Sequence, residues 1–222
     1  MTKSPAAETK RWYNDSCGAA LAMQFVGERW SLLIIRELMY GPRRFGELKL
    51  SLSGISANVL TQRLEGLEQA GILLRRKLPP PANVQVYQLT AWGYESETAI
   101  QELGRWAARS PTHDPSLPLS AVSLMMSART LYAGGMTATV GFRLGADTFV
   151  ARLTPTAIDI RRDDPAMADT VVEGAPHAIA AVIYGGRPLA DAENDGSIRI
   201  TGDHAVAKDY ITRFPLPAKM GG

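Results

Sequence analysis

The sequence has one cysteine and three histidines, and these scarcities exclude several kinds of site. Cys17 alone cannot form an intrachain disulfide or a multi-cysteine metal site. The three histidines are too far apart in the sequence to suggest a metal cluster. No apolar run approaches the ~20 residues that span a bilayer, and residues 1–10 lack the apolar core of a signal peptide. We therefore expect a cytoplasmic protein with no membrane association and no metal or other cofactor.

The composition is that of an ordinary globular protein, with 45% apolar and 21% charged residues. A length of 222 residues indicates one large domain or two small ones. The net charge of +2 is unevenly distributed, since residues 1–110 sum to +4 and residues 111–222 to −2. A basic N-terminal half is compatible with a nucleic-acid partner, although many soluble domains differ by this much.

Apolar spacing and turn residues predict several helices and one hairpin before residue 110. They are helices over 16–25, 29–39, 45–50 and 57–70, strands over 72–78 and 84–89, and a longer helix over 90–109. Ser56 and Thr90 can cap the helices that follow them, Gly71 takes a C-cap position, and a proline run over 79–81 marks the hairpin tip. A helix followed by a basic hairpin is typical of a winged helix-turn-helix.

The helix over 57–70 carries polar and small residues off its apolar stripe, mainly in its first two turns. A recognition helix reads base edges with such N-terminal side chains, because Asn and Gln can pair with adenine, Arg with guanine, and Ala or Thr with the thymine methyl. An isolated helix of this kind is more often a solvated face, but the neighbouring basic residues favour DNA. Arg43 and Arg44 precede the previous helix and could reach phosphates.

Three basic residues lie on one arm of the hairpin, and strand alternation means that they cannot all face DNA. At least one of them is expected to face solvent or an acidic neighbour. The complete set of predicted DNA-binding residues is Arg43, Arg44, Ser56, Ala57, Asn58, Thr61, Gln62, Arg63, Arg75, Arg76 and Lys77.

Together these residues resemble the HxlR family of MarR-like winged-helix transcription regulators, over residues of about 15–109. The matching residues are Cys17, Gly27-Glu28-Arg29-Trp30, Ile35-Arg36-Glu37-Leu38, Gly41-Pro42-Arg43-Arg44-Phe45-Gly46-Glu47-Leu48, Gly54-Ile55-Ser56, Val59-Leu60-Thr61-Gln62-Arg63-Leu64, Leu67-Glu68, Gly71, Pro80-Pro81, Val86-Tyr87-Gln88-Leu89-Thr90 and Gly93. The resemblance implies a homodimer built from the first and last helices of this domain, bound to a palindromic operator in double-stranded DNA.

Cys17 has two interpretations. In some members of the family the corresponding cysteine senses electrophiles or oxidants, although the family usually has a proline where this chain has Gly18. The alternative, which we favour, is a small residue buried at a dimer interface. A redox role needs a lowered pKa and exposure, which a sequence does not show.

A proline-rich break over 110–118 precedes a half with an α+β order of elements. The expected elements are helices over 119–131, 176–184, 188–193 and about 203–213, and strands over 137–144, 148–153, 157–161 and 197–201. This half has no phosphate loop, nucleophile elbow or paired metal ligands, so we expect no enzyme. Its acidic pairs, such as Asp163-Asp164, are interpreted as solvated loops.

Residues 178–184 are apolar almost all round, which indicates a helix that is buried or lines an apolar cavity. The run over 185–203 resembles the C-terminal part of the sterol carrier protein type lipid-binding fold, which implies an apolar tunnel for a fatty acyl or similar ligand. The candidate ligand-binding residues are Ile179, Val182, Ile183 and Leu189. The alternative is an ordinary core that binds nothing.

The sequence thus predicts an α+β protein with five segments. They are a flexible N-terminus over 1–14, a winged-helix domain over 15–109, a linker over 110–118, a sterol-carrier-like domain over 119–215 and a tail over 216–222. The predicted function is a homodimeric DNA-binding transcriptional regulator controlled by an apolar small-molecule effector. The alternative is a lipid carrier whose winged helix mediates protein contacts.

Overall fold

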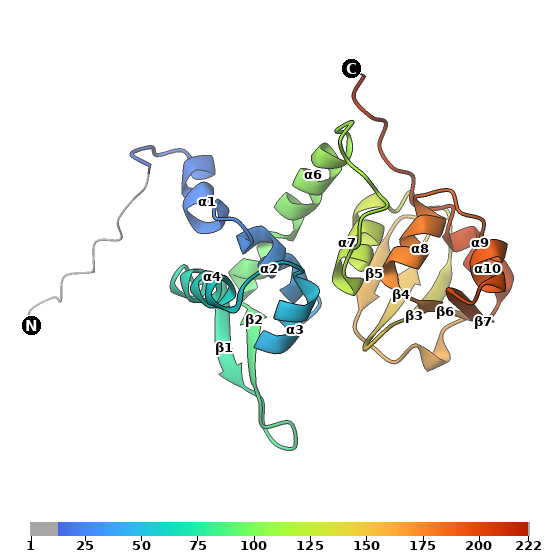
Figure 1. Cartoon of the computed structure of the whole chain (residues 1–222), viewed down its shortest axis with the longest axis horizontal. Coiled ribbons are helices and arrows are strands. Elements are labelled where there is room, and N and C mark those ends of the chain that lie inside the picture. Colours follow the sequence, from blue (N-terminus) through green and yellow to red (C-terminus); the bar gives the residue numbers. More distant parts are fainter. Residues whose placement is uncertain (1–12, 222) are drawn as a thin grey trace, which may run out of the picture.

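The computed structural model describes residues 13–221, so the predicted flexible N-terminus falls almost entirely outside the described residues. The chain forms an N-terminal unit of helices with one hairpin, and a C-terminal unit of helices on a larger sheet (Figure 1). The order of elements confirms the α+β class.

The N-terminal unit contains the predicted helices and hairpin with small changes at their ends. Its elements are α1 (Gly18–Val26), α2 (Ser31–Leu38), α3 (Phe45–Ser51), α4 (Ala57–Gln69), β1 (Leu73–Lys77), β2 (Gln85–Leu89), α5 (Ala91–Glu95) and α6 (Glu97–Ala108). The single helix predicted over 90–109 is wrong, because the chain breaks between α5 and α6 at Ser96. The Ser96 hydroxyl and N–H both bond the Gly93 carbonyl, which tightens that turn.

The predicted end signals are confirmed. Ser56 Oγ accepts the Val59 N–H over 3.2 Å, and Thr90 Oγ1 accepts the Gly93 N–H over 3.0 Å. Gly71 has a φ of +74°, the left-handed conformation that suits a glycine after a helix. Ser56 and Gly71 thus fix where α4 begins and ends, and so where its exposed face lies.

The C-terminal unit is built on a five-stranded sheet of order β5-β4-β3-β6-β7. Its strands are β3 (Ala138–Leu144), β4 (Asp147–Leu153), β5 (Ile158–Arg161), β6 (Thr170–Gly174) and β7 (Ile198–Gly202). Its helices are α7 (Ala121–Leu131), η1 (Pro165–Met167), α8 (Pro176–Ile183), α9 (Leu189–Asn194) and α10 (His204–Tyr210). Strands β3 and β6 are parallel, and the other neighbours are antiparallel. The sequence did not predict β6, which pairs on both sides.

Helix α7 joins the two units (Figure 1). It contacts α2 and α6 on one side, and β5 and α8 on the other. Because both sides are covered, most of its residues are buried, including Val122, Leu124 and Met125. The aromatic rings of Tyr40 and Phe149 also meet edge to face across the junction, with centroids 5.5 Å apart. The two units therefore share one continuous core.

The predicted linker contains no helix or strand, and the predicted tail lies against it. The Met220 N–H donates to the Arg109 carbonyl over 2.8 Å. Lys219 Nζ donates to the carbonyls of Ser110 and His113 over 3.0 and 2.8 Å. Within residues 13–221, no helix has the length and apolar character needed to cross a membrane.

Candidate nucleic-acid interface

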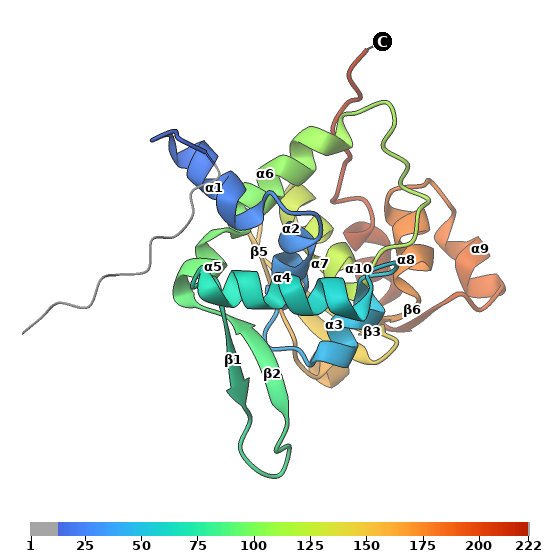
Figure 2. The ribbon, with the colours of Figure 1, turned by 60° about the vertical axis from the view of Figure 1, so that its left-hand side comes forward.

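Helix α4 presents a polar face beside the hairpin. Its apolar stripe is buried, whereas Asn58, Thr61 and Gln62 are exposed, together with Ala57. Figure 2 shows α4 lying across the front of the N-terminal unit with the β1–β2 hairpin projecting below it. The arrangement leaves three side chains with base-pairing chemistry accessible on one helix.

Arg63 and Ser56 belong to the predicted set but have other contacts. Arg63 Nη2 lies 2.7 Å from Glu28 Oε2, and its Nε donates to the Arg29 carbonyl. These contacts tie α4 to the turn between α1 and α2, so the Arg63 guanidinium is occupied. Ser56 uses its side chain as the helix cap.

The three basic residues of β1 are all exposed, and alternation along the strand puts Arg75 and Lys77 on one face and Arg76 on the other. Arg75 Nη2 lies 3.3 Å from Glu68 Oε2, and its guanidinium lies 5.4 Å from the centroid of the Tyr87 ring. This confirms that one of the three faces an acidic neighbour. Arg76 and Lys77 are exposed, so the hairpin offers two accessible cations toward its tip.

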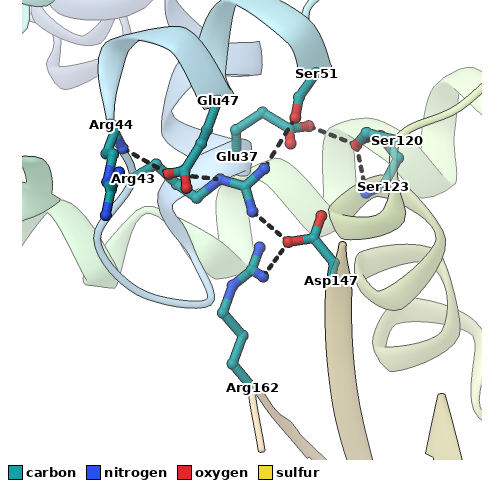
Figure 3. Close-up of polar contacts among 9 residues, drawn as sticks. All are labelled: Glu37, Arg43, Arg44, Glu47, Ser51, Ser120, Ser123, Asp147 and Arg162. Atoms are coloured by element: carbon teal, nitrogen blue, oxygen red, sulfur yellow. Dashed lines mark hydrogen bonds and ion pairs between the residues drawn. The ribbon is translucent and has the colours of Figure 1, made fainter. Parts of the chain in front are cut away.

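Arg43 and Arg44, predicted together as phosphate contacts, have different environments (Figure 3). Arg44 is exposed at the start of α3, where its N–H donates to Glu47 Oε2 over 2.7 Å. Arg43 is only 7% exposed. Its Nη1 donates to Asp147 Oδ1 over 2.6 Å and its Nη2 donates to Ser51 Oγ over 3.1 Å. The prediction for Arg43 is corrected: its guanidinium faces the C-terminal unit and is not available to a phosphate.

Asp147, at the start of β4, binds two arginines at once. Arg162 Nη1 also donates to Asp147 Oδ1, and the Arg162 guanidinium lies 4.7 Å from the centroid of the Phe149 ring. Burial opposes the charge of Asp147, but the hydrogen bonds and positive charges of Arg162 and Arg43 outweigh it and hold the pKa of this carboxyl below its usual value.

A second polar link joins α2 to α7. The Glu37 side chain is fully buried, and its Oε1 accepts from Ser120 Oγ over 2.7 Å and from Arg36 Nη2 over 2.9 Å. Ser120 Oγ in turn accepts the Ser123 N–H over 3.0 Å and so caps α7 (Figure 3). The first helix of the C-terminal unit is thus anchored to a buried carboxylate of the N-terminal unit.

Helices α1 and α6 have no buried residue, although both carry large apolar side chains. On α6, Trp106 is 73% exposed and Leu103 is 45% exposed. Leu21 and Met23 on α1 are exposed to a similar extent. Large apolar side chains exposed together on a helix often mark an association site, so these helices form candidate association surfaces.

Cys17 directly precedes α1 and is exposed in the single chain. Its N–H donates to Asp15 Oδ1 over 2.9 Å. Exposure in one chain is compatible both with burial at a dimer interface and with access to an oxidant.

The residues predicted to bind an apolar ligand pack into the core. Ile179, Val182 and Leu189 are 2%, 6% and 8% exposed, and Ile183 is partly buried against the core. Two hollows between the units, of about 360 and 650 Å³, are lined by other residues. The prediction is corrected because these side chains of α8 and α9 fill the interior, while Ala180 and Tyr184 line the smaller hollow.

No group of three or more His, Cys, Asp or Glu among residues 13–221 could hold a metal ion. Two of the acidic residues of the C-terminal unit have local structural roles instead. Asp164 caps η1, and Asp195 pairs with Arg187 while accepting the Ser197 N–H.

Comparison with known proteins finds similarity in the N-terminal half. A family model described as HxlR-like helix-turn-helix matches residues 25–114. The HTH-type transcriptional regulator YodB of Bacillus subtilis (strain 168) is 40% identical over 86 residues, which cover 39% of this chain and 77% of YodB. The uncharacterized HTH-type regulator YvaP of the same organism is 33% identical over 87 residues, covering 39% of this chain and 80% of YvaP.

One similar solved structure is the reduced form of YodB. It is 36% identical and covers 44% of this chain and 98% of that chain, with a TM-score of 0.40. Another structure of YodB is of its quinone-bound form, which is 36% identical and covers 40% of this chain and 93% of that chain, with a TM-score of 0.36.

Proposed function

This chain belongs to the HxlR-like helix-turn-helix family, and from that premise we propose that it is a sequence-specific DNA-binding transcriptional regulator. It acts as a homodimer and responds to a small, mainly apolar effector. The proposed DNA binding is supported by three exposed polar residues on α4, Asn58, Thr61 and Gln62. They lie beside a hairpin with two accessible cations.

Helix α4 enters the major groove and reads base edges with these three polar side chains. Arg44 at the start of α3 and the hairpin cations Arg76 and Lys77 bind phosphates, which fixes the register of the protein on the duplex. Arg43 and Arg63 hold the reading elements in place through Asp147 and Glu28.

The homodimer forms through α1 and α6. Their exposed apolar side chains support this proposal, because an interface would remove Trp106, Leu103 and Leu21 from water. A two-fold dimer presents two α4 helices in opposite orientation, so the operator is palindromic with half-sites about one helical turn apart. Cys17, which precedes α1, becomes covered in this dimer.

The C-terminal unit senses the effector. Its order of a helix, strands and small helices supports the resemblance to the sterol carrier protein type fold, which remains part of the proposal. An effector that binds one dimer geometry better than another would shift the spacing of the two α4 helices and thereby the affinity for DNA. A quinone is bound in one structure of YodB, so a small organic effector has a precedent in a relative.

The test is a selection from randomised DNA duplexes, followed by affinity measurements of the enriched sequence across a salt series. Specific binding should weaken steeply with salt through counterion release. A variant with Asn58→Ala and Gln62→Ala should lose the preference for the enriched sequence and keep the salt dependence. Absence of DNA binding even at low salt would overturn the proposal and favour a winged helix that contacts proteins.

A further inference from the structure

The smaller hollow between the two units is a cavity of about 360 Å³. Its walls come mainly from one face of α6, the segment over 113–119, one face of α7 and the end of α8, with Arg36 of α2 and Leu216 completing them. Ligand sites commonly have volumes of about 300–1,000 Å³ and lie between domains. The cavity therefore has the size and position of a site for a compact ligand.

The walls are mainly apolar, with a few polar groups. Ile100, Leu119, Met126 and Leu131 contribute apolar surface. Two arginines and one aspartate also line the cavity, and the arginines are paired with Glu37 and Glu102 beside it. These three lining residues are Arg36, Arg105 and Asp114.

Tyr184 and Ser127 both line the cavity, and their hydroxyl groups lie near each other. The Tyr184 hydroxyl oxygen is buried and forms no hydrogen bond of normal geometry with residues 13–221. Burial raises the pKa of Tyr184 to about 12, partly offset by the nearby Ser127 hydroxyl, so the phenol keeps its proton at neutral pH. A buried O–H donor without an acceptor is unfavourable, and a ligand oxygen that accepts from the Tyr184 hydroxyl would remove this penalty.

We propose that this cavity is the effector site and that it takes a compact apolar carboxylate, whose oxygen accepts a hydrogen bond from Tyr184. Calling the bound molecule an effector rests on the proposed regulator function. The existence of a ligand site in this cavity does not depend on DNA binding. It also replaces the predicted ligand site in α8 and α9, whose side chains fill the core.

Helix α6 connects this site to the proposed dimer interface, because its two faces have different neighbours. Ile100, Gln101, Gly104 and Ala108 line the cavity, whereas Trp106 is exposed on another side of the helix. A ligand that displaces α6 would therefore change the position of the association surface, and with it the spacing of the two reading helices.

Gly104 offers a direct test. A Cβ built at this position meets no atom within 4 Å, so a larger side chain can extend into the cavity. Gly104→Leu should occupy the space that a ligand needs while the surrounding fold is retained. Gly66→Leu, on the exposed side of α4, adds the same side chain where a Cβ also meets nothing and serves as the matched control.

The experiment titrates the full chain with 2-naphthoate and with naphthalene by isothermal titration calorimetry. We expect one 2-naphthoate per protomer, weakened about tenfold or more by Gly104→Leu and unchanged by Gly66→Leu. Tyr184→Phe should weaken 2-naphthoate about tenfold and leave naphthalene unchanged, because only the carboxylate can accept the lost hydrogen bond.

The proposal is overturned if 2-naphthoate does not bind, or if Gly104→Leu binds it as the wild type does. Equal effects of Tyr184→Phe on both probes would overturn the assigned carboxylate contact. DNA binding by the ligand-free wild type is measured on the same preparation. Its absence would overturn the proposed regulator function, while the titration would still decide whether the cavity is a ligand site.

Discussion

Arg43 and Asp147 are 104 positions apart in the sequence, yet Arg43 Nη1 donates to Asp147 Oδ1 over 2.6 Å. The pair joins the segment before α3, an element of the proposed DNA-binding surface, to the first residue of β4. The arginine is nearly buried, so loss of its partner would leave a charge with little access to water. Removal of one partner from such a pair costs more than the intact pair contributes.

Asp147→Asn is therefore expected to lower the free energy of unfolding by about 1–3 kcal/mol, less than for a fully buried pair because Asp147 is partly exposed. Urea denaturation of both proteins measures the difference. Asp159→Asn removes the partner of Arg161 in an exposed pair and should change stability by about 0.5 kcal/mol or less. Equal effects of the two substitutions would contradict the role assigned to Asp147.

The same carboxyl predicts a loss of stability in acid. Burial raises the pKa of Asp147, but the bonds and charges of Arg162 and Arg43 lower it further, so the folded-state pKa lies below the unfolded value. Its stabilising contribution is then complete above the unfolded pKa of about 3.9 and is lost as pH falls through the folded pKa. Urea midpoints measured from pH 6 to pH 2 should fall less steeply for Asp147→Asn than for the wild type. Parallel pH profiles would refute this.

Gln62→Ala should relax sequence preference. A side chain that pairs with one base discriminates against the others by about 1–3 kcal/mol. Its removal should therefore reduce the difference in binding free energy between the operator and its single-base variants. Competition binding with a panel of operator variants measures that difference. The proposed docking of α4 requires the loss to be concentrated at one position in each half-site, and a uniform loss across the panel would argue against it.

Arg76→Ala should weaken binding to all DNA sequences about equally and reduce the salt slope by about one. Arg43→Ala tests the correction made by the structure. Because its guanidinium binds Asp147 and Ser51, this substitution should lower stability and leave the salt slope unchanged. The comparison uses affinities from 50 to 200 mM salt. A reduced salt slope for Arg43→Ala would show that Arg43 does contact a phosphate.

Trp106→Glu should separate the proposed dimer. A buried tryptophan at an interface commonly contributes about 2 kcal/mol or more, so we expect the dimer dissociation constant to rise by about tenfold or more. Sedimentation velocity across a concentration series measures it. Met167→Glu changes a residue of η1 that is 93% exposed and should leave the association state unaltered. If both variants sediment as the wild type does, α6 is not the interface.

Local signals predicted most of the fold. The spacing of Leu60, Leu64 and Leu67 defined the buried side of α4, and Ser56 and Gly71 fixed its ends. Such features depend on neighbours three or four positions away, so a single sequence contains them. Strand β6 has only two β-branched apolar residues in succession, and its stability comes from pairing with β3 and β7, which are distant in sequence.

The site was harder to predict because long-range partners decide which cations are available. Nothing near Arg43 in the sequence indicates Asp147, and nothing near Arg63 indicates that Glu28 folds back onto it. The expectation of an acidic neighbour for one hairpin cation was met by Arg75, whose partner Glu68 is close to it in the sequence. The cavity could not be predicted, since its walls meet only when the segment over 113–119 packs against α6, α7 and α8.

Helix α7 couples the unfolding of the two units. It is buried from both sides, and the carboxylate of Glu37 in α2 is shielded from water together with it. If the C-terminal unit melted alone, α2 would lose its cover and that carboxylate would be exposed. The two halves should therefore lose structure in a single cooperative step. Because α7 contacts both units, it cannot move toward the sheet without moving away from α2 and α6. A displacement in one unit would therefore be transmitted to the other.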